Sequence, residues 1–147
     1  MKVMQLSVFL ENKPGELSGP CKALTDAGIN LLSVSLADTR QFGILRMIVS
    51  DPDKGKAVLE RAGCVVNLTP VVAIDIPDKP GALASIVKSL EEAAINIEYL
   101  YAFCSRIAGH AVLVMRFDAP DAAIAALQST GARVLQAAEL LDRVQEN

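Results

Sequence analysis

The spacing of hydrophobic and polar positions changes period several times along the first half of the chain. Apolar residues alternate with polar ones where strands are expected and recur every three or four positions where helices are expected. In chain order this predicts a strand over residues 5–10, a helix of about 13 residues that begins at Pro14-Gly15, strands over residues 31–36 and 44–49, a helix from about Asp53 to Gly63, and a strand over residues 64–68. The order of elements is β-α-β-β-α-β.

The second half repeats the first. A shift of 66 positions lays residues 10–31 over residues 76–97 with nine identities in 22 places, among them Pro14/Pro80 and Gly15/Gly81. Farther along the shift is 68, so we expect two extra residues in a hairpin between Asn96 and Pro120. The expected elements are strands over residues 71–76, 97–103, 110–117 and 133–136, helices around residues 83–90 and 121–128, and a short tail around residues 139–144.

This duplicated order predicts an α+β fold. Each half has the split βαβ pattern of a ferredoxin-like βαββαβ unit, and right-handed crossovers place both helices of a half on one face of an antiparallel sheet. We expect two domains in tandem, residues 1–69 and 70–147, that meet near Thr69-Pro70 without a linker.

Composition narrows the class of protein. Hydrophobic residues make up 52% of the 147 residues and charged residues 21%, which is typical of a folded globular chain. No apolar stretch reaches the roughly 18 to 20 residues of a membrane span, and the N-terminus lacks a signal-peptide pattern, so we expect a cytoplasmic protein with no membrane partner. A net charge of −3 and only 4% aromatic residues argue against a nucleic-acid partner.

Residues suited to catalysis or metal binding are few. The three cysteines, Cys21, Cys64 and Cys104, have no C-x-x-C spacing, and Cys21 and Cys64 occupy apolar positions, so we expect inert thiols. The one histidine, His110, opens a predicted strand. No cluster suggests a metal site and no glycine-rich motif suggests a cofactor, so we expect no enzyme. A small enzyme that uses Cys104 with His110 is the catalytic alternative.

Two matching loops are the main candidate sites. Residues 12–17 and 78–83 each place Pro-Gly between the first strand and the first helix of their half. One interpretation is only a helix start, because proline suits the first turn and Asn or Asp caps its amides. The other is an anion site, in which unpaired amides at Gly15 to Leu17 receive a carboxylate and the Asn12 amide serves either end of a zwitterion.

The string Asn-Lys-Pro-Gly-x-Leu, the helix after it and Gly28-Ile29-Asn30 resemble the ACT domain, a regulatory module that binds amino acids, and the whole chain is similar to stand-alone pairs of such domains. The loop and Asn30 also resemble the serine-sensing domain of phosphoglycerate dehydrogenase. That domain's histidine is replaced here by Leu10 and by Ile76, so serine itself is not implied. The resemblance implies the following ligand-binding residues: Asn12, Lys13, Pro14, Gly15, Glu16, Leu17 and Asn30 in the first half, and Asp78, Lys79, Pro80, Gly81, Ala82, Leu83 and Asn96 in the second.

The resemblance implies a non-catalytic regulatory protein that binds a small amino acid between domains or between subunits. It further implies a homodimer and a separate effector protein, such as an enzyme. The first loop is favoured because Asn12 is neutral, whereas Asp78 repels a carboxylate; Glu16 is the argument against it. The alternative is an assembly module whose loops bind nothing.

Overall fold

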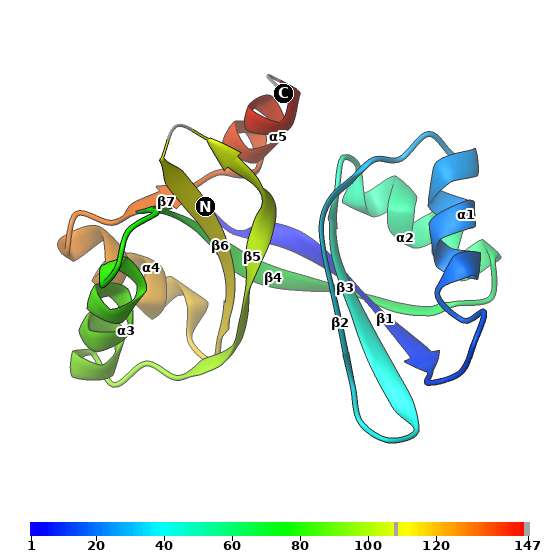
Figure 1. The fold of residues 1–147 in the computed structure, drawn as a ribbon, viewed down its shortest axis with the longest axis horizontal. Helices are drawn as coiled ribbons and strands as arrows, with labels where there is room; N and C mark the ends of the chain where they lie inside the picture. Colours follow the sequence, from blue (N-terminus) through cyan, green and yellow to red (C-terminus); the bar gives the residue numbers. More distant parts are fainter. Residues whose placement is uncertain (108, 146–147) are drawn as a thin grey trace. The chain divides into compact units, whose positions relative to one another are not determined.

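The structure, a computed structural model, describes residues 1–107 and 109–145, and of these the side chains of all but 104–107 and 143–145. The chain divides into two compact units (Figure 1). We call Met4–Thr69 the first unit, and Pro70–Asn147 together with Met1–Val3 the second unit.

The first unit has the ferredoxin-like order. Its elements are β1 (Val3–Glu11), α1 (Ser18–Asp26), β2 (Leu31–Asp38), β3 (Phe42–Val49), α2 (Pro52–Arg61) and the first part of β4 (Val65–Pro77). The strands lie in the order β2-β3-β1-β4, and β3 is antiparallel to both β1 and β2. The two crossovers, through α1 and α2, therefore join strands that are not neighbours, as the sequence predicts.

The second unit repeats this order. Its elements are the rest of β4, α3 (Ala82–Glu92), β5 (Ile97–Ile107), β6 (His110–Phe117), α4 (Pro120–Ser129), β7 (Arg133–Leu135) and α5 (Ala137–Gln145). The strands run β7-β4-β6-β5, all antiparallel to their neighbours. The sequence predicts two separate strands on either side of Thr69-Pro70, but β4 is continuous. The residue before a proline favours extended backbone, so this dipeptide needs no turn.

Each unit has its own core between its sheet and its two crossover helices. In the first unit, Leu6, Val8 and Leu45 from the sheet are fully buried with Leu59 from α2. In the second, Val72, Ile74, Met115 and Phe117 are fully buried with Leu90 of α3 and Leu127 of α4. The period-2 alternation of the strands thus marks the face that meets the helices.

The helix α1 begins later than its sequence predicts. It covers nine residues from Ser18, after a turn over residues 14–17, and not about 13 residues from Pro14-Gly15. Pro20 explains the difference, because a proline has no N–H to donate and is tolerated only in the first turn of a helix. The equivalent residue of α3 is Ile86, and α3 begins directly after its loop, at Ala82.

The two extra residues of the second half lie in its hairpin, as predicted. The strand β5 is 11 residues long where β2 has eight, and its pairing with β6 shifts register between Ala102 and Arg106. An irregularity of this kind absorbs additional residues without moving the rest of the ladder.

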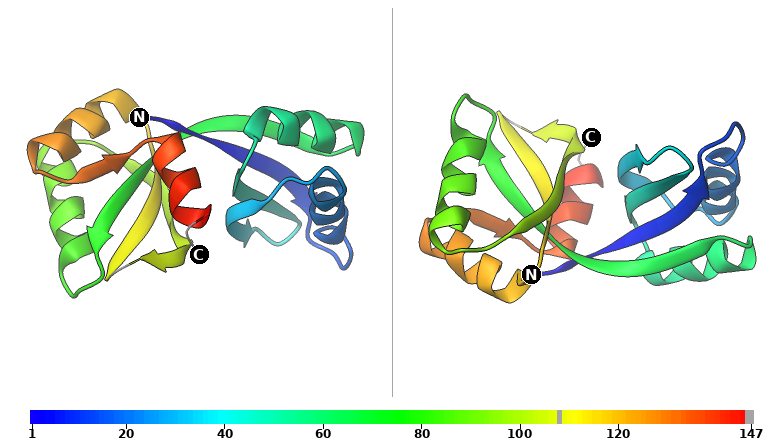
Figure 2. Two further views of the ribbon diagram at one scale, coloured as in Figure 1. Left: turned by 90° about the horizontal axis from the view of Figure 1, so that it is seen from above. Right: turned by 90° about the horizontal axis from the view of Figure 1, so that it is seen from below.

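The last helix has no counterpart in the first unit. Figure 2 shows α5 on the side of its sheet opposite α3 and α4, and Leu140 of α5 is 1% exposed. The sequence assigns this segment only to a short tail, whereas it covers part of a sheet face. Among the described residues no helix is both long and apolar enough to span a bilayer.

Candidate functional site

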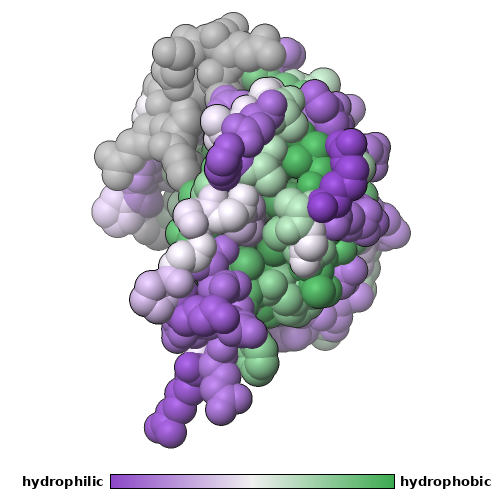
Figure 3. Space-filling model, turned by 90° about the vertical axis from the view of Figure 1, so that its right-hand side faces the viewer, coloured by the Kyte–Doolittle hydropathy of each residue, from purple (hydrophilic) through white to green (hydrophobic). Residues whose placement is uncertain are grey.

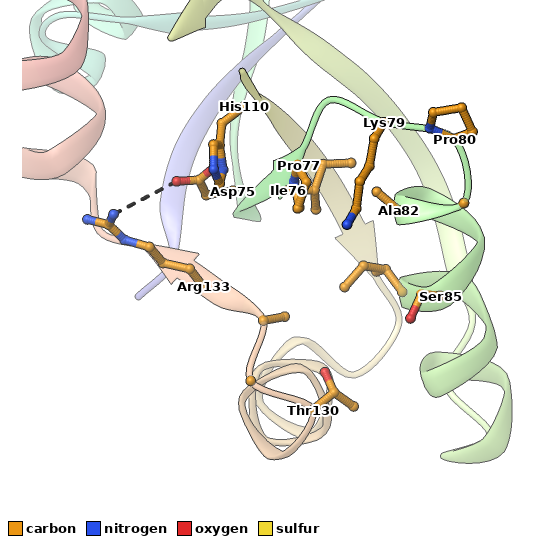
Figure 4. Close-up of a pocket in the computed structure, with 14 residues that line it drawn as sticks. Asp75, Ile76, Pro77, Lys79, Pro80, Ala82, Ser85, His110, Thr130 and Arg133 are labelled. Atoms are coloured by element: carbon orange, nitrogen blue, oxygen red, sulfur yellow. Dashed lines mark hydrogen bonds and ion pairs between the residues drawn. The ribbon is translucent and has the colours of Figure 1, made fainter. Parts of the chain in front are cut away.

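A cavity of about 640 Å³ opens beside the Pro-Gly loop of the second unit (Figure 4). This volume lies within the range of small-molecule pockets. Four segments line it: the end of β4 with the loop after it, the start of α3, the first residue of β6, and the turn between α4 and β7 with the first residue of β7. The lining residues include Asp75, Lys79, Ala82, Ser85, His110 and Arg133.

The Pro-Gly loop and the first turn of α3 lie beside this cavity. Gly81 has a φ of +89°, a conformation that glycine adopts without strain, and it precedes α3 with no side-chain cap. The Ala82 N–H donates to the Lys79 carbonyl at 3.3 Å and the Ser85 N–H to the Gly81 carbonyl at 3.0 Å. Within the described part of the chain, the N–H of Leu83 has no acceptor, so the first turn of α3 carries partial positive charge.

Lys79 adds a full positive charge at the same end of the cavity. Figure 4 shows its ammonium directed downward from the loop, between Pro77 and Ala82. No ion pair of Lys79 occurs among residues 1–107 and 109–145. An anionic group in the cavity would therefore meet a lysine and an uncapped helix start together.

The other end of the cavity is formed by Asp75, His110 and Arg133. His110 Nδ1 lies 2.8 Å from Asp75 Oδ1, and Arg133 Nη1 lies 3.9 Å from Asp75 Oδ2. The Asp75 side chain is 5% exposed, whereas that of His110 is 48% exposed. The buried carboxylate thus holds a half-exposed imidazole at the wall of the cavity, and Figure 4 shows the three side chains on neighbouring strands.

The equivalent cavity of the first unit is smaller and differs in chemistry. It measures about 380 Å³ and is lined by the loop glycine Gly15, the start of α1 and the turn between α2 and β4. The internal alignment places Phe9, Phe42 and Val65 where the second unit has Asp75, His110 and Arg133. All three are exposed, at 45%, 59% and 65%. The first unit therefore has no polar wall at this position.

The lysine of the first loop is neutralised by its own neighbours. Lys13 Nζ lies 2.6 Å from Glu11 Oε2 and 3.6 Å from Glu16 Oε1, and the hydrogen bond and charge of Glu11, then the charge of Glu16, raise the pKa of Lys13. In the second loop, Pro77 and Ala82 occupy the positions of these two glutamates. This difference explains why only Lys79 remains available.

Asn12 is also engaged within the first unit. Its Nδ2 donates to Asp38 Oδ2 at 2.7 Å, and its backbone N–H donates to the Gln41 carbonyl at 2.9 Å. Asn12 and Asp38 line a separate hollow of about 270 Å³, together with Lys13, Glu16 and Leu17. The side-chain amide of Asn12, which the sequence predicts to bind a ligand, thus donates to a carboxylate of the same unit.

The structure does not bring the two strand asparagines to the loops of their own units. Asn30 precedes β2 and bonds through its backbone to Ser50, whereas Asn12 lies beside the opposite end of that eight-residue strand. At about 3.3 Å per residue the two ends are roughly 25 Å apart. Asn96 likewise precedes β5 and lines a different open hollow. Each strand asparagine thus lies at the opposite end of its unit from the Pro-Gly loop, because the first helix returns the chain to the far end of the sheet.

The thiols offer no support for catalysis within the described residues. Cys21 and Cys64 are free and partly buried, and burial, then the charge of Glu16, raises the pKa of Cys64. The side chain of Cys104, the partner in the catalytic alternative, lies outside the described residues. His110 has Asp75 as its partner. No group of three or more His, Cys, Asp or Glu side chains in the described part of the chain could hold a metal ion.

Sequence reasoning missed the polar wall of the second cavity. Asp75 and Arg133 are not among the predicted ligand-binding residues, and the sequence predicts His110 only as the start of a strand, with catalysis as the alternative. The signal was present in the internal repeat, because these positions change from apolar in one copy to charged or polar in the other. Their meeting at one cavity depends on β7 pairing with β4, which places Arg133 opposite Asp75.

Large apolar side chains also remain exposed on the first unit. Phe9, Phe42, Leu36 and Val65 are each at least 45% exposed. Figure 3, seen from the side that carries α1 and α2, shows apolar surface between charged side chains. Apolar side chains that remain exposed are candidates for an interaction surface.

Comparison with known proteins gives the following matches. The sequence matches the family described as ACT domain pair over residues 1–140. The structure of protein BT0572 from Bacteroides thetaiotaomicron is 40% identical, with 96% of each chain covered and a TM-score of 0.90. The ligand-free regulatory subunit of aspartate kinase from Thermus thermophilus shares the fold at 16% identity, with 86% of this chain and 90% of that chain covered and a TM-score of 0.60. Escherichia coli aspartokinase III in complex with lysine and aspartate shares it at 14% identity, with 88% of this chain and 31% of that chain covered and a TM-score of 0.51. A search of curated protein sequences found no match.

Proposed function

Because the chain belongs to the ACT domain pair family, we propose that it is a non-catalytic regulatory protein that binds a small amino acid. The observation that carries the proposal is the cavity of the second unit, where Lys79 and the uncapped start of α3 meet beside the Pro-Gly loop. An α-carboxylate is the group that this end of the cavity suits.

The second loop is the better of the two candidate loops. In the first loop, Lys13 pairs with Glu11 and Glu16. The side chain of Asn12 donates a hydrogen bond to Asp38. The neutral side chain of Asn12 favours the first loop in the sequence, but in the folded chain this amide donates to Asp38. The proposed site therefore contains Lys79, Pro80, Gly81, Ala82 and Leu83.

Regulation requires that the ligand changes an equilibrium. A ligand that binds one arrangement of the protein better than another shifts the population by no more than that difference in affinity, commonly about 1 to 3 kcal/mol. We propose that the equilibrium is self-association into a homodimer or binding to a separate effector protein. The exposed apolar side chains of the first unit support such an interaction.

The proposal is tested by thermal denaturation of the whole chain with each of the twenty amino acids, followed by calorimetric titration of those that raise the melting temperature. At 100 times its Kd a specific ligand stabilises the folded protein by roughly 2.7 kcal/mol. Lys79→Gln should weaken every binding amino acid about tenfold or more, because charged hydrogen bonds contribute about 1.5 to 3 kcal/mol. Lys88→Gln, a lysine of α3 that is 75% exposed and pairs with Glu92, is the matched control.

The competing function is an assembly module whose loops bind nothing. It is favoured if none of the twenty amino acids changes the melting temperature while the chain still dimerises. Sedimentation velocity with and without the best ligand measures the dimer directly. An unchanged sedimentation coefficient at saturating ligand would remove self-association as the regulated step.

A further inference from the structure

The polar wall of the second cavity is not required by the fold. The first unit builds the same order of strands and helices with Phe9, Phe42 and Val65 where the second has Asp75, His110 and Arg133. A buried carboxylate is costly unless it is paired, so its presence on one unit alone calls for a role beyond folding.

The contact with Asp75 fixes the hydrogen on the imidazole. A carboxylate accepts hydrogen bonds, and at 2.8 Å the Nδ1 of His110 must donate to it. In the neutral ring the hydrogen is therefore on Nδ1, and Nε2 has a free lone pair. Since His110 lines the cavity and is half-exposed, that lone pair is the hydrogen-bond acceptor which the imidazole offers to a ligand.

The remaining charged groups around this pair keep it in place. Arg133 Nη1 is 3.9 Å from the second oxygen of Asp75, and its Nη2 is 2.9 Å from Glu139 Oε1 on α5. Glu139 Oε2 in turn accepts the backbone N–H of Gln136 at 2.8 Å, directly before the helix. The guanidinium is thus held between β4 and α5, so Asp75 keeps its orientation toward His110.

The two ends of the cavity consequently suit different chemical groups of a ligand. Lys79 and the first turn of α3 suit a carboxylate, whereas His110 suits a hydrogen-bond donor. Resting on the function proposed above, we propose that His110, positioned by Asp75, selects amino acids whose side chain donates a hydrogen bond over aliphatic amino acids of the same shape. The first unit, with Phe42 in place of His110, lacks this selectivity.

Threonine and valine form the sharpest test, because they differ in a hydroxyl and a methyl group. Asparagine and leucine form a second pair of similar size. One net hydrogen bond contributes about 0.5 to 1.5 kcal/mol, so the donor of each pair should bind roughly three- to tenfold more tightly in calorimetric titrations. The expected stoichiometry is one ligand per chain.

His110→Asn separates selectivity from binding. The asparagine amide can still donate to Asp75, which preserves the buried contact, but it has nothing in the place of Nε2. Threonine should then bind no more tightly than valine. Phe42→Asn, at the equivalent position of the first unit, is the matched control and should leave both affinities as they are.

The tautomer can be observed directly, because His110 is the only histidine of the chain. Long-range ¹H–¹⁵N spectra should show the hydrogen on Nδ1 in the free protein and a change in the Nε2 shift when the donor amino acid is added. A hydrogen on Nε2, or equal affinities within both pairs, overturns the selectivity while amino-acid binding itself stands. If no amino acid binds at all, it is the proposed function that fails.

Discussion

The carboxylate of Asp75 is buried and the imidazole that it holds, His110, is half-exposed, with Oδ1 and Nδ1 2.8 Å apart. The two residues come from adjacent antiparallel strands, where Pro77 is the direct partner of His110 and Asp75 lies two positions farther along β4. The imidazole therefore lies diagonally across the ladder from the carboxylate, on the same face of the sheet.

This pair should stabilise the second unit. In His110→Ala the buried carboxylate loses the imidazole N–H, which costs about 1 to 3 kcal/mol of unfolding free energy. In His110→Asn a donor remains, so the loss should be smaller by about 1 kcal/mol. Urea denaturation followed by circular dichroism measures both. Equal losses for the two variants would show that the contact with Asp75 contributes nothing and that only packing is lost.

Gly55 in α2 leaves no room for a larger residue. A Cβ at this position would lie 2.9 Å from Leu6 Cδ1 and 3.4 Å from Val49 Cγ2. Gly55→Ala should therefore destabilise the first unit by about 1 to 3 kcal/mol through overpacking, less about 1 kcal/mol from better helix propensity.

The second unit has different residues at the positions equivalent to Gly55 and Leu6. Ala123 and Val72 occupy the positions of Gly55 and Leu6, and both are fully buried. The double variant Gly55→Ala with Leu6→Val should hence be more stable than the sum of its single changes predicts. A double-mutant cycle by chemical denaturation gives this coupling, and strict additivity would contradict it.

Glu11 should raise the pKa of Lys13 measurably. Glu11→Gln removes its charge, so the pKa of Lys13 should fall toward its ordinary value of 10.5. Because the pKa is raised in the folded protein, the favourable interaction is fully present below about pH 10.5 and is lost as pH rises through the folded pKa. An NMR titration of the Lys13 side chain, with Lys22 as an internal control, would show no difference between the two proteins if the pair were absent.

Cys64 should react slowly, because burial and the nearby charge of Glu16 raise the pKa of its thiol. A variant that keeps only this cysteine (Cys21→Ser, Cys104→Ser) should be alkylated by iodoacetamide at pH 7.5 several-fold more slowly when folded than in urea, since the thiolate is the nucleophile. Mass spectrometry gives both rates. Folded-state alkylation as fast as in urea would mean that this thiol is not shielded.

Local sequence signals established most of the fold. Alternation over residues 5–10 and 44–49, together with the repeat that superposes Pro14 on Pro80, was enough for two ferredoxin-like units, because these signals depend only on neighbours in the chain. The late start of α1 was also readable in principle, since Pro20 limits where that helix begins. The continuity of β4 was not, because a Thr-Pro pair is compatible with either a break or an extended strand.

The order of residues along the chain is enough to show the alternation, the turns and the repeat, and hence the family and the two Pro-Gly loops. The folded chain is needed to see that Lys13 is paired while Lys79 is available, and that Asp75, His110 and Arg133 meet at one cavity. The reason is physical: propensity and periodicity act between residues close in the chain, whereas charge pairing and burial depend on which distant strands become neighbours. Asp75 and Arg133 are far apart in sequence, and the pairing of β4 with β7 makes them adjacent.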